Sequence, residues 1–183
     1  LIITSPPYGD SRTTVAYGQF SRLASLWLSF EREFRKEIIL KLDDISLGGN
    51  LNSDLKLRLI VRSISPTLDE VVKIVEKKDG ERARELLTYF SDLYRSLQKM
   101  YEVLDNYGVC CIVIANRTVR RIFIPTNIII AELAAEIGFG EDIVMIARKI
   151  PVKRIPWENA PENIPGLKGK TMNEETIIIM RKK

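Results

Sequence analysis

The chain has 183 residues, a formal charge of +4, 45% hydrophobic residues and 28% charged residues. This length predicts one domain with a sizeable core, and the balanced composition excludes a disordered tail, a collagen-like fibre and a disulfide scaffold. The sequence contains no run of about 18 uncharged apolar residues, so we expect no membrane span and a cytoplasmic location. The modest positive charge permits an anionic partner without requiring one.

The absence of histidine and the presence of only two cysteines exclude several kinds of catalytic and metal site. The chain has no histidine, which excludes an imidazole base, a histidine zinc ligand and a Ser-His-Asp triad within it. Its two cysteines, Cys110 and Cys111, are too few for a zinc site, and as neighbours on a strand they would point to opposite faces. We therefore expect two reduced thiols and no metal centre. Abundant Ile, Lys, Arg and Glu are typical of a thermophilic source.

The first 106 residues predict one strand followed by several helices. Ser5-Pro6-Pro7 ends the first apolar run, a buried strand, because proline cannot donate to a sheet ladder. Thr67 and Glu70 form a capping-box pattern, and helical spacing of apolar residues places Trp27 in the core. The expected elements in chain order are a strand at 1–4, a loop at 9–19, a helix from about 20 to 41, a turn-rich connection at 43–54, a stretch at 55–64 that fits helix or strand, a helix from Thr67 to near Gly80 and a long helix from about Glu81 to Asn106.

The remaining residues predict strands separated by one helix. Gly108 stops the long helix as a C-terminal glycine, and the apolar run Val109–Ala115 fits a central strand covered on both faces. Strands alternating with helices predict a mostly parallel α/β sheet. Because only a loop joins the last two strands, they should pair antiparallel. The further elements expected are an extended piece at 120–124, a helix capped by Thr126 and ended by Gly138, a strand at 143–150, a long loop at 151–173 and a strand at 176–180.

The stretch from Thr4 to Tyr8 lies at the carboxyl end of the first strand, where ligands bind in open α/β sheets. Its residues suit methyl transfer to the exocyclic amine of a base. Such an amine is a poor nucleophile because its lone pair is delocalised into the ring, so both of its N–H groups need acceptors. Ser5 Oγ is one acceptor, and the carbonyl of Pro6, held rigid by two prolines, is the other. Tyr8 offers a face on which a flipped base stacks, worth about 1–3 kcal/mol.

The motif Ser5-Pro6-Pro7-Tyr8 resembles the catalytic motif of amino-methylating DNA methyltransferases. The serine form is most typical of cytosine-N4 enzymes, whereas adenine-N6 enzymes more often carry Asp or Asn at the position of Ser5. Residues 9–22, and Asn173–Thr176 followed by an apolar strand, also resemble archaeal-type members. The resemblance implies a partial Rossmann-like methyltransferase fold that uses S-adenosylmethionine, acts on DNA and serves restriction-modification.

The sequence departs from this family at the cofactor motif, a glycine-rich turn after the first strand with an acidic residue on the next strand. Neither Gly48-Gly49-Asn50 nor Gly138-Phe139-Gly140 fills that role. Thr4 and Ser5 are the expected cofactor contacts, and the rest of the site is expected in a missing amino-terminal half or a complementary chain. Residues 1–183 would then form the target-base-binding half-domain, with a helical insertion at about 20–106 and an open sheet edge that also suits a homodimer.

Candidate DNA contacts lie in two segments, and each has a plain alternative as solvated surface. Asn116 either lines the pocket or caps a turn. The leading hypothesis is a cytosine-N4 DNA methyltransferase; the alternatives are an adenine-N6 or RNA methyltransferase, and a non-catalytic nucleic-acid-binding or assembly subunit. The candidate contacts are Asp10, Arg12, Tyr17, Arg22, Lys153, Arg154, Lys168 and Lys170.

Overall fold

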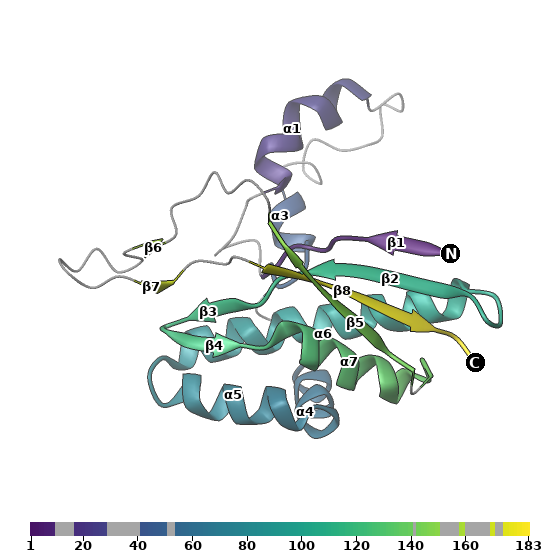
Figure 1. Ribbon diagram of the computed structural model, residues 1–183. Coiled ribbons are helices and arrows are strands. Elements are labelled where there is room, and N and C mark those ends of the chain that lie inside the picture. Colours follow the sequence, from purple (N-terminus) through teal and green to yellow (C-terminus); the bar gives the residue numbers. More distant parts are fainter. Residues whose placement is uncertain are drawn as a thin grey trace.

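A computed structural model describes residues 1–9, 17–28, 41–50, 54–140, 142–150, 158–159, 169–170 and 174–183. Within these residues the chain forms a main sheet, two small hairpins and a set of helices (Figure 1). The strands are β1 (Ile2–Thr4), β2 (Val109–Ile114), β3 (Arg117–Val119), β4 (Ile122–Ile124), β5 (Val144–Lys149), β6 (Glu158–Asn159), β7 (Gly169–Lys170) and β8 (Glu174–Arg181). The helices are α1 (Tyr17–Leu28), α3 (Leu42–Ile45), α4 (Leu55–Ile64), α5 (Pro66–Glu76), α6 (Gly80–Val103) and α7 (Thr126–Ile137).

The main sheet of the described residues has the strand order β1-β2-β8-β5. β1 is parallel to β2, and β8 is antiparallel to both of its neighbours. The antiparallel pairing predicted for the last two strands is therefore confirmed. The sheet is mixed, however, rather than mostly parallel, because β8 enters between β2 and β5 and makes two of the three neighbouring pairs antiparallel. This mixed α/β arrangement is consistent with a methyltransferase fold.

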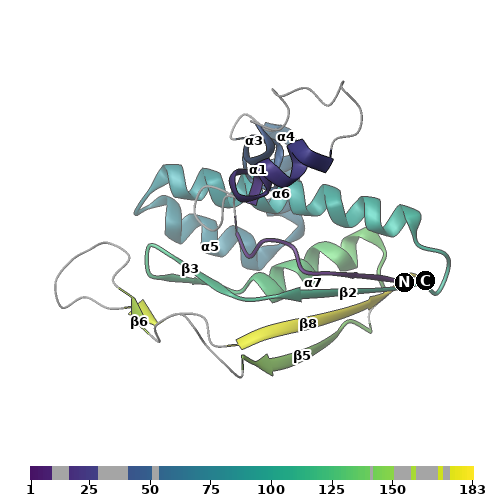
Figure 2. The same ribbon diagram turned by 90° about the horizontal axis from the view of Figure 1, so that it is seen from above.

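Helices α6 and α7 lie along one face of this sheet, and α4 and α5 pack against these two helices on the side away from it (Figures 1 and 2). Side chains of β2 alternate accordingly, with Cys110, Ile112 and Ile114 fully buried and the residues between them half-buried. β2 is thus covered on one face among the described residues, not on both as its apolar run suggested. The long helix α6 supplies much of the core through Tyr89, Phe90, Leu93 and Leu97, each of which is fully buried.

β1 is an edge strand of the described sheet, and its burial differs from the prediction of a buried strand. Ile2 packs against the core, whereas Leu1 is 81% exposed and Ile3 is 71% exposed. The pattern follows from the two-residue alternation of a strand: Ile2 faces the helices, and Ile3 faces the opposite side. We call that opposite side the open face of the sheet; it also carries Cys111 and Ile179, which pair across β2 and β8.

Helix α1 stands away from the sheet and its covering helices (Figure 1). Its amino end begins at 17, inside the predicted loop, and is capped by Asp43, whose carboxylate accepts the backbone N–H groups of Gly18 at 2.7 Å and Gln19 at 2.9 Å. Trp27 is 87% exposed, so its placement in the core was wrong. The predicted continuation at 29–40 lies outside the described residues. No helix among the described residues is long and apolar enough to span a membrane.

Two of three predicted helix ends differ from the structure. Ser65, not Thr67, caps α5 by accepting the N–H of Leu68 at 3.0 Å. The long helix is followed by Tyr107, whose φ of 63° takes the left-handed conformation expected of Gly108. Gly138, with φ of 112°, does end α7 as predicted.

The start of α7 carries no side-chain cap from Thr126. Instead, the side-chain oxygen of Asn116 accepts the backbone N–H of Asn127 at 3.1 Å. Of the two readings of Asn116, the structure therefore shows the capping contact.

Candidate active site

The turn Ser5–Tyr8 leaves the sheet at the carboxyl end of β1. Thr4 is still paired with Ile112 of β2, so the turn lies where two parallel strands end together. Ser5 is exposed, Pro6 is buried, and Pro7 and Tyr8 are half-buried. The predicted catalytic residues thus run from the exposed Ser5 to Pro6, which is buried in the body of the protein.

Tyr89 of α6 anchors the backbone of this turn. Its hydroxyl donates a 2.6 Å hydrogen bond to the carbonyl oxygen of Pro7. The ring is fully buried and makes an edge-to-face contact with the ring of Phe90, with centroids 5.1 Å apart. The turn is therefore fastened to the helical core by a rigid side chain. The sequence predicted the long helix that carries Tyr89 but not this hydrogen bond.

The hydroxyl of Tyr8 donates a 2.7 Å hydrogen bond to Oε1 of Glu175 on β8. The other carboxylate oxygen of Glu175 accepts Nε of Arg148 at 3.2 Å and forms an ion pair with Nη2 of the same guanidinium. Arg148 stands directly opposite Glu175 in the register of β5 and β8. Sequence reasoning did not single out Glu175 or Arg148 for the site; Glu175 appeared only within the family-like stretch Asn173–Thr176.

The charges of this group fix its protonation. The hydrogen bond from Arg148, and then that from Tyr8, hold the pKa of Glu175 below its usual range, so its carboxylate is ionised. Burial, and then the bond to Glu175, raise the pKa of Tyr8, while the neighbouring Ser5 side chain acts in the opposite direction. The one hydroxyl proton of Tyr8 is given to Glu175 and is therefore not donated to Ser5. The hydroxyl oxygen of Ser5 has two lone pairs that can accept hydrogen bonds.

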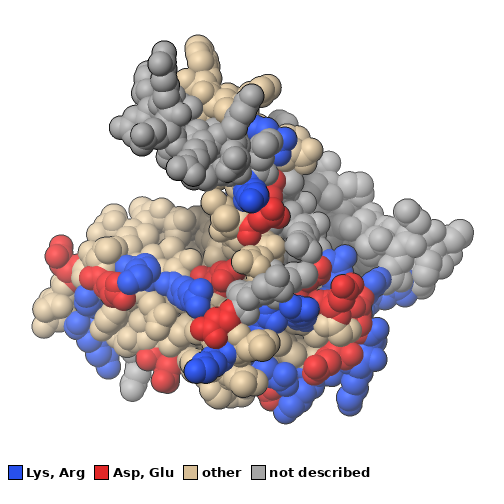
Figure 3. Space-filling model, turned by 180° about the vertical axis from the view of Figure 1, so that it is seen from behind, with Lys and Arg blue, Asp and Glu red and all other residues tan. Residues whose placement is uncertain are grey.

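The predicted nucleic-acid contacts are only partly placed. Asp10, Arg12, Lys153, Arg154 and Lys168 lie outside the described residues. The backbones of Tyr17 and Lys170 lie in α1 and β7, and their side chains are not described. Arg22 is half-buried on α1. On the face shown in Figure 3, described cations and anions are interspersed rather than separated into fields of one sign.

The described residues do not by themselves fit S-adenosylmethionine. Gly48, with φ of 74°, follows the short helix α3, and Gly138 closes α7 with Tyr101 packed against it, only 3.0 Å from where a Cβ would stand. Neither glycine follows a strand, as the family's cofactor turn does. Thr4 and Ser5, the two predicted cofactor contacts, lie at the end of β1.

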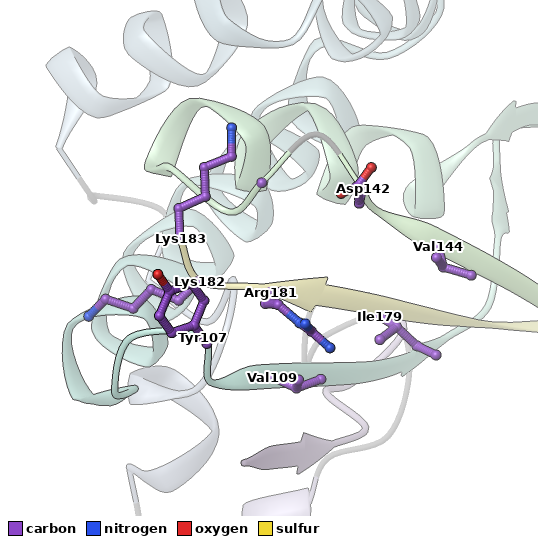
Figure 4. A pocket seen from close by; sticks show the side chains of 9 residues that line it. Tyr107, Val109, Asp142, Val144, Ile179, Arg181, Lys182 and Lys183 are labelled. Atoms are coloured by element: carbon purple, nitrogen blue, oxygen red, sulfur yellow. The ribbon is translucent and has the colours of Figure 1, made fainter.

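A separate hollow of about 480 Å³ opens at the other end of the sheet (Figure 4). Its lining includes Val109 at the start of β2, Arg181 at the end of β8, and Lys183. Since the Ser5–Tyr8 turn lies beyond the carboxyl ends of β1 and β2, this hollow is not part of the candidate active site.

The chain is similar to the type II methyltransferase M.MvaI of Kocuria varians, with 39% identity over 182 residues. The match covers 99% of this chain and 40% of that protein. No family model and no solved structure matches the chain. The chain spans about two fifths of the length of this curated relative and, along nearly its whole length, is similar to part of a methyltransferase.

Proposed function

We propose that this chain is the target-base-binding half of an S-adenosylmethionine-dependent DNA methyltransferase that modifies an exocyclic amine, cytosine N4 by preference. The observation that carries the proposal is the Ser5–Tyr8 turn at the carboxyl edge of the sheet, fastened at Pro7 by Tyr89 and at Tyr8 by Glu175. The similarity to a type II methyltransferase supports it. Such an enzyme would act in the cytoplasm.

The residues of the turn act on the amine of a flipped base. Ser5 Oγ and the carbonyl of Pro6 accept its two N–H groups, which localises the nitrogen lone pair. The ring of Tyr8 supplies the stacking surface that compensates for the loss of base stacking in the duplex. S-adenosylmethionine supplies the methyl group, bound mainly by residues outside this set. Serine in the first position is the feature that favours cytosine N4 over adenine N6.

A further segment is proposed to cover the open face of the sheet. Ile3 is 71% exposed, and Val144 and Ile146 are 50% and 47% exposed. Apolar side chains gathered on one sheet face mark an interaction surface. Because the chain matches only 40% of its relative, we propose that the remaining part of the enzyme, on the same chain or on a complementary one, occupies this face and completes the cofactor site. A homodimer is the alternative arrangement.

The test uses the intact enzyme and counts methyl groups transferred to DNA. Ser5→Ala and Tyr8→Ala should abolish transfer, whereas Ser63→Ala and Tyr107→Ala, at exposed positions on α4 and after α6, should leave it unchanged. Mass analysis of the nucleosides should find N4-methylcytosine. N6-methyladenine or methylated RNA would select the corresponding alternative, and unchanged transfer in both Ser5→Ala and Tyr8→Ala would exclude this site.

Calorimetry addresses the alternative of a non-catalytic subunit. We expect the intact enzyme to bind S-adenosylmethionine and this chain alone, shown to be folded by circular dichroism, to bind it weakly or not at all. Tight binding by the isolated chain would contradict the proposed division of the cofactor site. An intact protein that binds DNA but not S-adenosylmethionine would favour the assembly subunit.

A further inference from the structure

Glu175 is a charged group at the candidate site that the proposed chemistry does not use. It lies 167 residues after Tyr8 and contacts it at 2.7 Å. Its side chain is 13% exposed, whereas that of Arg148 is 57% exposed. Each of its two oxygens has its own donor, the Tyr8 hydroxyl on Oε1 and the Arg148 guanidinium on Oε2. A shielded carboxylate held at both oxygens has one orientation.

This carboxylate decides which way the hydrogen bonds of the site run. An ionised carboxylate only accepts, so Tyr8 must donate its single proton to Glu175. With its proton on Glu175, Tyr8 has none to donate to the nearby Ser5 side chain, whose oxygen keeps its acceptor capacity. Without the carboxylate the Tyr8 proton could turn to Ser5 Oγ and occupy the lone pair that an amine N–H needs.

The same contact orients the ring of Tyr8. Its backbone side is held by the bond between Tyr89 and the preceding Pro7 carbonyl, and its far end is held by Glu175. A ring fixed at both ends presents its face to a base without reorganisation, which is what precise positioning requires.

We propose that Glu175, held by Arg148, is a positioning residue that binds the hydroxyl proton of Tyr8 and keeps the Tyr8 ring in one orientation, so that this proton does not compete with the target amine for Ser5 Oγ. This inference rests on the proposed function. A merely structural role as a cross-strand ion pair between β5 and β8 is the competing explanation. That role would not require Glu175 to contact Tyr8, and ion pairs with one exposed partner contribute little to stability.

The experiment is a double-mutant cycle in the intact enzyme, with kcat and KM for DNA measured for each variant. Glu175→Ala should lower kcat at least about tenfold, the effect of losing one hydrogen bond to a charged group, with a smaller change in KM. Tyr8→Phe removes the hydroxyl through which Glu175 acts. The double variant should therefore be no slower than Glu175→Ala alone.

Glu174→Ala is the matched control, because the neighbouring carboxylate is exposed and points to the other face of β8; its kcat should equal that of the wild type. Glu175→Gln keeps the shape of the side chain, should fold if the alanine variant does not, and should show the same non-additivity with Tyr8→Phe. The inference is overturned if the two single effects multiply in the double variant, or if Glu175→Ala and Glu175→Gln both keep wild-type kcat. A wild-type enzyme without methyl transfer would instead overturn the proposed function, and this inference with it.

Discussion

The two faces of the sheet differ in what they contribute. On the covered face, Ile112, Ile114 and Ile178 are fully buried under the helices. On the open face, Ile3 and Ile146 remain largely exposed, and the Tyr8–Glu175–Arg148 group lies at the carboxyl edge. Stability is thus concentrated on one side of the sheet and the proposed chemistry on the other. Tyr89, which is buried in the core and bonded to Pro7, connects the two.

The largest expected difference is in stability. Phe90→Ala, at a fully buried position, should lower the free energy of unfolding of this chain by about 3–5 kcal/mol, because it removes a ring and leaves a cavity. Ile3→Ala, at a position 71% exposed, should lower it by less than about 0.5 kcal/mol. Urea unfolding followed by circular dichroism measures both. Equal losses of unfolding free energy would mean that Ile3 is as tightly packed as Phe90, which would contradict an uncovered open face.

A second substitution breaks the connection between the faces. Tyr89→Phe keeps the ring but removes the donor to the Pro7 carbonyl, so we expect a loss of about 0.5–1.5 kcal/mol of stability together with a clear fall in methyl transfer by the intact enzyme. Tyr94→Phe on the same helix, at a position 7% exposed, serves as the control and should affect stability alone. If the two variants retain the same activity, Tyr89 does not position the turn.

A smaller effect is expected from acid. The pKa of Glu175 is lowered in the folded chain, chiefly by Arg148, so its contribution to stability is fully present above the ordinary carboxyl range near about 4.3 and is lost as the pH falls through the lowered value. Glu175→Gln lacks this contribution. Unfolding measured from about pH 7 to about pH 3 should show the two proteins converging in acid. A stability difference that stays constant over that range would contradict this role of the Glu175 charge.

The two cysteines can serve as chemical probes of the two sheet faces, and we expect their labelling to have the smallest effect on the protein itself. Burial raises the pKa of Cys110 to about 11, and its side chain lies in the core, whereas Cys111 is half-buried on the open face. A thiol reagent should label Cys111 in the native chain and Cys110 only after unfolding. Equal labelling rates would remove the distinction between the faces. Protection of Cys111 in the intact enzyme would indicate a segment covering the open face.

Strong local patterns made much of the fold predictable. Helical spacing of apolar residues located α6, and Gly138 marked the end of α7 because only that position of the turn needs a positive φ. The same patterns failed at Trp27, because spacing identifies an apolar face but not what covers it. The capping box predicted that Thr67 caps α5, and this was wrong because the side-chain oxygen of Ser65 accepts the N–H of Leu68.

The candidate site was predictable only in its local part. Ser5–Tyr8 is contiguous in the sequence, and proline fixes its geometry. Glu175 and Arg148 reach Tyr8 through strand order and register, which place Glu175 opposite Arg148 and bring β8 beside β2. Nothing within a few residues of Glu175 encodes that neighbourhood. Tyr89 shows the same limit, since helical spacing locates its helix but does not identify the partner of its hydroxyl.

The bond between Tyr8 and Glu175 spans 167 residues of chain, which has a consequence for biosynthesis. A ribosome that adds roughly 5–20 residues per second makes the turn on the order of ten seconds before it makes the carboxylate that orients it. During that interval Tyr8 lacks this partner, and β2 lacks the antiparallel neighbour β8. The site can therefore take its final form only after Glu175 and the rest of β8 have been synthesised.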